Sequence, residues 1–178
     1  MKRLWYVGLY LVFLLGGPGG TEILCAGTGQ DGELQRGITW PNPRFTDNGD
    51  DTITDNLTGL MWTKDANLYE TRNWTQALSD CESCTVGGYD DWHLPQRREL
   101  FSLVHDVYYN PSLPNTAGTG QWTRGDPFIN VQSSYYWSST TSTYFTYQAC
   151  GVGLLNAFVV INAKSKAYYV WCVRGGSD

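Results

Sequence analysis

Four of the five cysteines, all those after Cys25, constrain the fold of this 178-residue chain more than any other feature of its sequence. They are spread over some ninety positions, so a bond between distant members would join segments that are far apart in the chain. In an exported protein, an even number of cysteines predicts a disulfide framework, and four cysteines allow three pairings. The residues alone leave the pairing open among Cys81, Cys84, Cys150 and Cys172.

The N-terminus predicts export. Lys2 and Arg3 precede the non-polar stretch 4–15, which is too short for a bilayer of about 30 Å, and a Gly- and Pro-rich segment follows it. We therefore expect a signal peptide at residues 1–26, with cleavage after residue 20 as an alternative, a linker at 27–43, and no transmembrane span in the mature chain. A lipid anchor on Cys25 is less favoured, because Leu24 is larger than the residues that lipoprotein processing accepts.

Two other roles for the cysteines fit the sequence less well. The Cys81-x-x-Cys84 spacing resembles a redox motif, but such a motif belongs at the start of a helix after a strand, and here it closes a predicted helix. A zinc site would need a second pair of ligands, and His93 and His105 each stand alone. We expect no metal and no cofactor.

Composition predicts one folded domain and argues against some classes of binding partner. Apolar residues make up 42% of the chain and charged residues only 16%, which is not the balance of a disordered protein. Twelve basic residues against seventeen acidic ones give a net charge of -5, so we expect no nucleic-acid partner. An acidic cluster at Asp47, Asp50, Asp51 and Asp55 lacks the ligand spacing of a calcium loop and is interpreted as a hairpin turn.

Local patterns predict two helices between groups of strands. Asn-Gly at positions 48–49 predicts a hairpin between 44–46 and 52–55, followed by a strand at 57–62. A helix over 73–84 places Trp74, Ala77, Leu78 and Cys81 on one apolar stripe. A second helix is predicted to begin at Pro95, with Leu100, Leu103 and Val104 on its buried side.

The last third of the chain predicts strands after a long loop at 108–131. Aromatic and β-branched residues mark strands at 135–139, 144–150, 158–162 and 168–174. Two central helices with antiparallel strands on either side predict an α+β domain.

Four ordered motifs resemble the C-terminal domain of the Legionella collagen-like adhesin. They are FTDNGDDTITDNLTGLMW at 45–62, GGYDDWHLP at 87–95, YYWSSTT at 135–141 and CVRGG at 172–176, and the resemblance covers residues 44–176. It implies a C-type-lectin-like domain, in which two short helices pack on twisted antiparallel sheets and the strands from both ends meet. The fold is related to that of the formylglycine-generating enzyme.

The resemblance also implies export and one particular disulfide. Its members are mostly exported surface or periplasmic proteins, so we expect the periplasm, the cell surface or the extracellular space. The named adhesin binds sulfated polysaccharides, but this chain lacks the collagen-like repeat and is acidic, which argues against a polysulfate ligand. The family's helix-to-last-strand disulfide corresponds to Cys81–Cys172, and the rival pairing is Cys81–Cys84 with Cys150–Cys172.

We expect a binding or adhesion module for a protein or glycan, with no catalytic residue. If Cys172 points inward, strand alternation turns Trp171 outward. The predicted ligand-binding patch then comprises Phe145, Tyr147, Phe158, Val160 and Trp171.

Three alternatives remain. One is a variable protein of a diversity-generating retroelement, with a diversified surface at residues 142–171: Gly151, Gly153, Leu154, Phe158, Val160, Ile161, Ala163 and Ala167 stand where relatives commonly carry Asn or Tyr. Another is an envelope structural protein. The third, an enzyme like the formylglycine-generating family, is disfavoured because no close pair of cysteines lies near the C-terminus, and nothing in the sequence activates Ser138 or Ser139.

Overall fold

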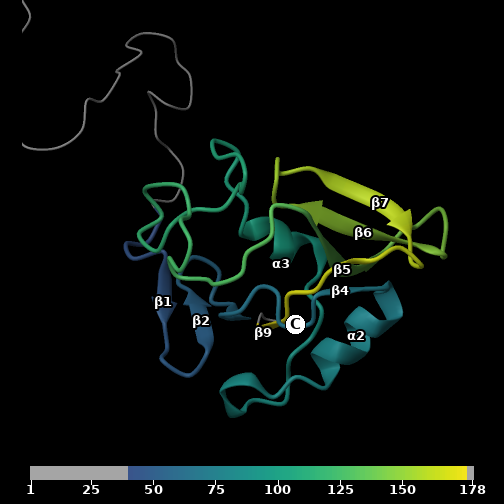
Figure 1. Cartoon of the computed structure of the whole chain (residues 1–178), viewed down its shortest axis with the longest axis horizontal. Coiled ribbons are helices and arrows are strands. Elements are labelled where there is room, and N and C mark those ends of the chain that lie inside the picture. The colour runs from purple at the N-terminus through teal and green to yellow at the C-terminus, as the bar shows by residue number, and fades with distance from the viewer. Residues whose placement is uncertain (1–39, 176–178) are drawn as a thin grey trace, which may run out of the picture. The chain divides into compact units, whose positions relative to one another are not determined.

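Two β-sheets and two α-helices form the scaffold of the computed structural model, which describes residues 40–175, and turns and loops connect them (Figure 1). The first sheet has the order β1-β2-β3-β9, with β1 Phe45–Asp47, β2 Thr52–Asp55, β3 Met61–Thr63 and β9 Val173–Arg174. The second has the order β4-β8-β5-β6-β7, with β4 Thr71–Arg72, β5 Tyr135–Thr141, β6 Gln148–Gly153, β7 Val159–Ala163 and β8 Tyr168–Tyr169. The predicted α+β class is confirmed.

Several predicted elements are confirmed with shifted ends. The N-terminal hairpin pairs Phe45 with Asp55, as its Asn-Gly turn indicates. The strand expected at 57–62 begins only at Met61, because the backbone N–H of Asp55 donates to Leu60 and closes a turn (2.8 Å). Not every strand pair is antiparallel, since β5 and β8 run parallel at Tyr136 and Tyr169. The signal peptide and residues 27–39 of the linker, with Cys25, lie outside the described residues.

The helices α2 (Trp74–Glu82) and α3 (Arg97–Ser102) each begin at a capping box. In α2 the cap is Asn73, the first residue of the predicted helix. In α3 the cap is Gln96, so the predicted start at Pro95 is wrong. The carbonyl of Pro95 accepts a hydrogen bond from the Ser139 N–H (2.8 Å), which holds this residue in an extended segment beside β5. A short 3-10 turn, η1 (Val86–Gly88), lies between the helices.

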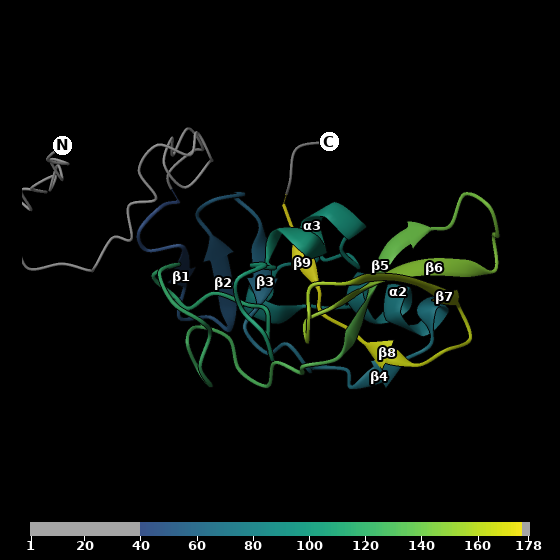
Figure 2. The same ribbon diagram turned by 90° about the horizontal axis from the view of Figure 1, so that it is seen from above.

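The two helices cover opposite faces of the second sheet. Ala77 and Cys81 of α2 pack in a cluster with Trp137 and Ala149. Leu100 of α3 and Leu103, which caps the end of this helix, pack in a cluster with Tyr136 and Val152. Because neighbouring residues of a strand point to opposite faces, β5 and β6 present one cluster to each helix (Figure 2). The β7 edge extends beyond both helices.

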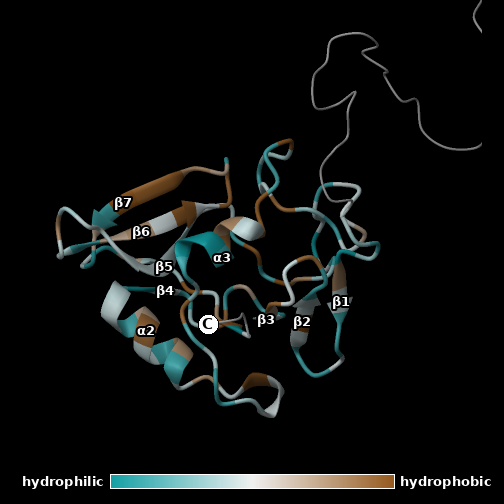
Figure 3. Cartoon of the chain, turned by 180° about the vertical axis from the view of Figure 1, so that it is seen from behind, coloured by the Kyte–Doolittle hydropathy of each residue, from teal (hydrophilic) through white to brown (hydrophobic). Residues whose placement is uncertain are grey.

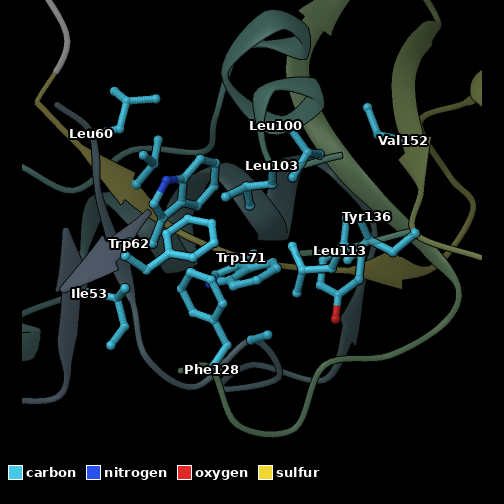
Figure 4. Close-up of a cluster of buried hydrophobic side chains, with 14 residues drawn as sticks. Ile53, Leu60, Trp62, Leu100, Leu103, Leu113, Phe128, Tyr136, Val152 and Trp171 are labelled. Carbon is cyan, nitrogen blue, oxygen red and sulfur yellow. The ribbon is translucent and has the colours of Figure 1, made fainter. Parts of the chain in front are cut away.

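Trp171 lies at the centre of the core cluster drawn in Figure 4. Its ring meets those of Phe128, Trp62 and Tyr136 at centroid distances of 4.8, 5.6 and 5.7 Å. Its indole N–H donates to the carbonyl of Thr63 (2.8 Å) and is thereby satisfied without solvent.

The prediction that Trp171 points to solvent is therefore wrong. It assumed one continuous strand over 168–174, whereas β8 ends at Tyr169 and β9 begins at Val173 in the other sheet. The residues between them cross from one sheet to the other through the interior, so all of 170–173 are buried. Alternation of side chains holds within a strand and fails where the chain passes between sheets.

The disulfide joins Cys81 of α2 to Cys172, 91 residues later, as the resemblance implies. Cys84 and Cys150 are both buried free thiols. The rival pairing is absent, and the weaker expectation that these two residues also form disulfides is wrong. A disulfide forms and persists in an oxidising compartment, which supports export.

A buried ion pair ties the first sheet to the end of α3. Arg44 donates from Nε and Nη2 to the two carboxylate oxygens of Asp55 at 2.7 and 2.8 Å, and Nη2 also donates to the carbonyl of Ser102 (2.9 Å). Both charged side chains are fully buried. The pair fixes where α3 ends relative to the N-terminal hairpin.

Removing the cross-link in a Cys81→Ala/Cys172→Ala variant should lower the free energy of unfolding by about 4 kcal/mol, because the bond closes a loop of some ninety residues in the unfolded chain. Urea denaturation measures this. Cys84→Ala removes a buried thiol without cutting a cross-link and should cost much less. Equal losses for the two variants would contradict the account.

Replacing Trp171 with Ala should destabilise the domain by about 3–5 kcal/mol, because it empties the centre of the core. Phe158→Ala is the control, since that side chain is 64% exposed and its loss should change stability by about 0.5 kcal/mol or less. Thermal unfolding of both variants separates them. A Trp171→Ala domain as stable as the wild type would show that the ring is not buried.

Candidate ligand-binding site

The predicted ligand patch is divided in the structure. Phe145 and Tyr147 lie together, with ring centroids 5.6 Å apart, and both are more than half exposed. Phe158 is also more than half exposed but lies at the other end of β7. The Lys164 N–H donates to Tyr147 just after the last residue of β7, whereas the Gly153 N–H donates to Phe158 just before its first residue. Six residues of strand separate the two ends, about 20 Å. Val160 is half-buried, and Trp171 belongs to the core.

The residues of the retroelement hypothesis are also divided between surface and interior. Phe158, Ile161 and Ala167 are exposed, but Gly151, Gly153 and Leu154 are buried. At Gly151 a Cβ atom would lie 3.0 Å from the Tyr136 carbonyl oxygen, so a larger residue there would force the strands apart. Substitutions at the buried positions would change packing instead of a displayed surface.

A hollow of about 360 Å³ lies beside α3. Arg97, Arg98, Phe101 and Ser102 of the helix form one wall, and Val159 of β7 forms the other. Phe101 and Val159 are 38% and 42% exposed, so the hollow is lined by apolar side chains together with two arginines.

A second hollow of about 220 Å³ shares Arg97 with the first. Its lining comes from residues 140–144, at the end of β5 and the start of the β5–β6 loop, together with Cys150 and Ile161. We call the two hollows together the α3 groove. Its polar half carries four hydroxyl side chains, and Tyr144 beside them is 88% exposed.

Hydrogen bonding leaves part of this polar half open to a ligand. The Thr140 hydroxyl accepts from the Arg97 N–H, and the Ser142 hydroxyl accepts from the backbone of Tyr144 and Phe145. Within residues 40–175, the side chains of Thr141 and Thr143 have no hydrogen-bond partner. Arg97 and Arg98 likewise form no ion pair with a carboxylate of that part of the chain, unlike Arg44, Arg72 and Arg174.

His93 and Glu99 form an ion pair at the other end of α3. His93 Nε2 lies 3.4 Å from Glu99 Oε2. The Glu99 carboxylate raises the pKa of His93 above its ordinary value, against the effect of burial. Burial raises the pKa of Glu99, but the hydrogen bonds from His93 and from the Gln96 N–H outweigh it and lower that pKa. The pair thus fixes the N-terminus of α3.

The nucleophile candidates lie apart from the histidines. Ser138 is buried and donates to the Cys150 carbonyl at 2.8 Å. The Ser139 N–H bonds to Pro95. His105 stacks between Trp40 and Tyr108, with centroids 5.0 and 4.6 Å away. Among residues 40–175, no cluster of three His, Cys, Asp or Glu side chains could hold a metal ion.

The family follows from a model of the Lcl C-terminal domain, which matches residues 51–174 and thus more than half of the chain. The chain belongs to the Lcl C-terminal domain family. No curated protein matches it. The matched residues include both helices and every strand except β1, so the α3 groove lies within the Lcl C-terminal domain. No helix in the described part of this domain has the length and apolar character to cross a membrane.

Sequence reasoning missed Arg97 and Arg98. The available signal was a pair of adjacent arginines in the first turn of a helix, where the dipole favours acidic residues, within a chain that is acidic overall. What the sequence did not reveal is that β7, sixty residues later, would form the opposite wall.

The His93–Glu99 pair should make stability depend on pH. Because the folded-state pKa of His93 is raised, its contribution is fully present below the ordinary histidine pKa, near 6.5, and is lost as the pH rises through the folded value. The stability difference between the wild type and His93→Gln should therefore be larger at about pH 5.5 than at about pH 8.5. Urea denaturation at both values measures it, and equal differences would contradict the ion pair.

Proposed function

We propose that this Lcl C-terminal domain is an exported, non-catalytic binding module whose ligand occupies the α3 groove. The observation that carries the proposal is the placement of two guanidinium groups without a carboxylate partner in residues 40–175 beside an apolar wall and unengaged hydroxyls. Arginine without a partner binds carboxylates through paired, charge-assisted hydrogen bonds. The open hydroxyls and Tyr144 suit a sugar, whose ring stacks on an aromatic face while its hydroxyl groups exchange hydrogen bonds.

The ligand we propose is a glycan that places a single carboxylate at each α3 groove. The net charge of -5 disfavours a polyanion, because long-range repulsion acts on every added negative charge. A single carboxylate held by Arg97 and Arg98 neutralises part of their positive charge and adds only one negative charge to the long-range repulsion. A neutral sugar residue then fills the polar half of the groove.

The fold we propose is C-type-lectin-like. Its support lies in the pairing of β9 with β3, which brings strands from both ends of the domain into one sheet, and in the disulfide from α2 to the segment before β9. The periplasm, the cell surface and the extracellular space all suit such a module. The absence of catalysis is supported by the contacts of the two histidines. His93 is paired with Glu99, and His105 packs against Trp40 and Tyr108, so neither lies beside a serine that it could activate.

Binding to a panel of carboxylated, neutral and sulfated glycans tests the function. Arg97→Gln/Arg98→Gln should weaken binding of carboxylated members by about tenfold or more, since hydrogen bonds to charged groups contribute about 1.5–3 kcal/mol each. Arg124→Gln is the control, because it removes an exposed arginine from a loop outside the groove.

Two outcomes would overturn this assignment. Binding that survives the double substitution but is lost in Phe145→Ala/Tyr147→Ala would move the site to the aromatic pair of the β5–β6 loop. A domain that binds no member of the panel, although folded, would reject a glycan ligand.

A further inference from the structure

Strand β7 ends the second sheet and leaves one edge open. Among the described residues it pairs with β6 alone, over Val159–Ala163. Figure 3 shows β7 as a largely hydrophobic strand at the outer edge of the sheet. Exposed edge strands usually carry a charge, a proline or a bulge that prevents pairing with another chain, and Val159–Ala163 contains no charge or proline and pairs with β6 in unbroken register.

The backbone groups that face outward on β7 can be identified from its bonds to β6. The Gly153 N–H donates to Phe158, and the Lys164 N–H donates to Tyr147. In an antiparallel pair, bonded positions alternate, so residues 158, 160, 162 and 164 face β6. The N–H and C=O groups of Val159 and Ile161 and the N–H of Ala163 therefore point to the open edge, whereas the Ala163 carbonyl accepts from the Lys166 N–H (2.9 Å).

The side chains at this edge are apolar and uncharged. Val159 and Ile161 are 42% and 52% exposed and lie on the face that α3 covers only in part. The next charged residue along the strand, Lys164, places its ammonium group over the ring of Trp74, 3.8 Å from the centroid, and the charges across the α3 groove, Arg97 and Arg98, belong to α3. Between two chains that each carry a net charge of -5, repulsion is weakest at a surface free of acidic residues, and Val159–Ala163 is such a surface.

We propose that two copies of this chain pair antiparallel through β7, with Ile161 of one copy opposite Ile161 of the other. In this register Val159 faces Ala163 of the second copy. The two Ile161 residues exchange N–H and C=O, and each Ala163 N–H donates to the Val159 carbonyl of the other copy. Every cross-strand pair on the α3 face is apolar, and no like charges oppose each other. The occupant of the edge is thus a second copy of the same strand.

The pairing has a consequence that rests on the proposed function. The two-fold axis of such a pair runs perpendicular to the sheet, so equivalent faces of both copies lie on the same side. Val159 and Ile161 line the α3 groove and also flank the seam. Two grooves would then open side by side and engage two carboxylates of one glycan, which raises avidity without a new contact.

Sedimentation of the mature chain without ligand tests the pairing independently of any binding function. The wild type should sediment as a dimer. Ile161→Lys should weaken association by at least about tenfold, because it places two ammonium groups on the two-fold axis. Its circular dichroism spectrum should match that of the wild type, and any loss of melting temperature should follow the loss of the dimer. Phe145→Lys is the matched control, since Phe145 is also 52% exposed but lies in the β5–β6 loop, and it should stay dimeric.

A wild type that is monomeric at about 100 µM, or a dimer that Ile161→Lys leaves intact, would overturn the proposal.

Hydrogen exchange supplies a second criterion. The amides of Val159, Ile161 and Ala163 should become more protected as protein concentration rises. Protection that is independent of concentration and disappears when residues 27–39 are removed would assign the edge to the chain's own N-terminal segment instead.

Discussion

The passage of residues 170–173 through the interior is the constraint on which the rest of the structure depends. These four residues leave the second sheet at β8, cross the core and join the first sheet at β9. On the way, Trp171 fills the centre of the aromatic core, and Cys172 is bonded to α2. One short segment therefore fixes the position of both sheets and of one helix.

This arrangement also forms the α3 groove, the ligand site that we propose. With α2 held to one face by the disulfide and α3 held by Arg44 and by the His93–Glu99 pair, the second sheet is rigid where the helices cover it. Its β7 edge extends beyond them, and the α3 groove forms at the boundary between covered and open sheet. A fixed helix beside an open strand positions two arginines without requiring any loop to move.

The site was less predictable than the fold because its parts are distant in sequence. The exposure of Phe145, Tyr147 and Phe158 could be inferred from their strand and loop context, and it is found. Their separation along β7 depends on the register with β6, which local patterns do not encode. Arg97 and Val159 gain their shared role only because α3 packs across β5 and β6.

The sequence by itself determined the α+β class, the N-terminal hairpin, the stripe of α2 that buries Cys81 and, through the family resemblance, the Cys81–Cys172 bond. These features depend on local periodicity, turn chemistry and recognisable motifs. Only the tertiary structure decided that Trp171 is buried, that Cys84 and Cys150 remain free, and that Arg97 faces Val159. The physical reason is that the chain changes sheets between Tyr169 and Val173, and side-chain alternation gives no signal of where a strand leaves one sheet for another.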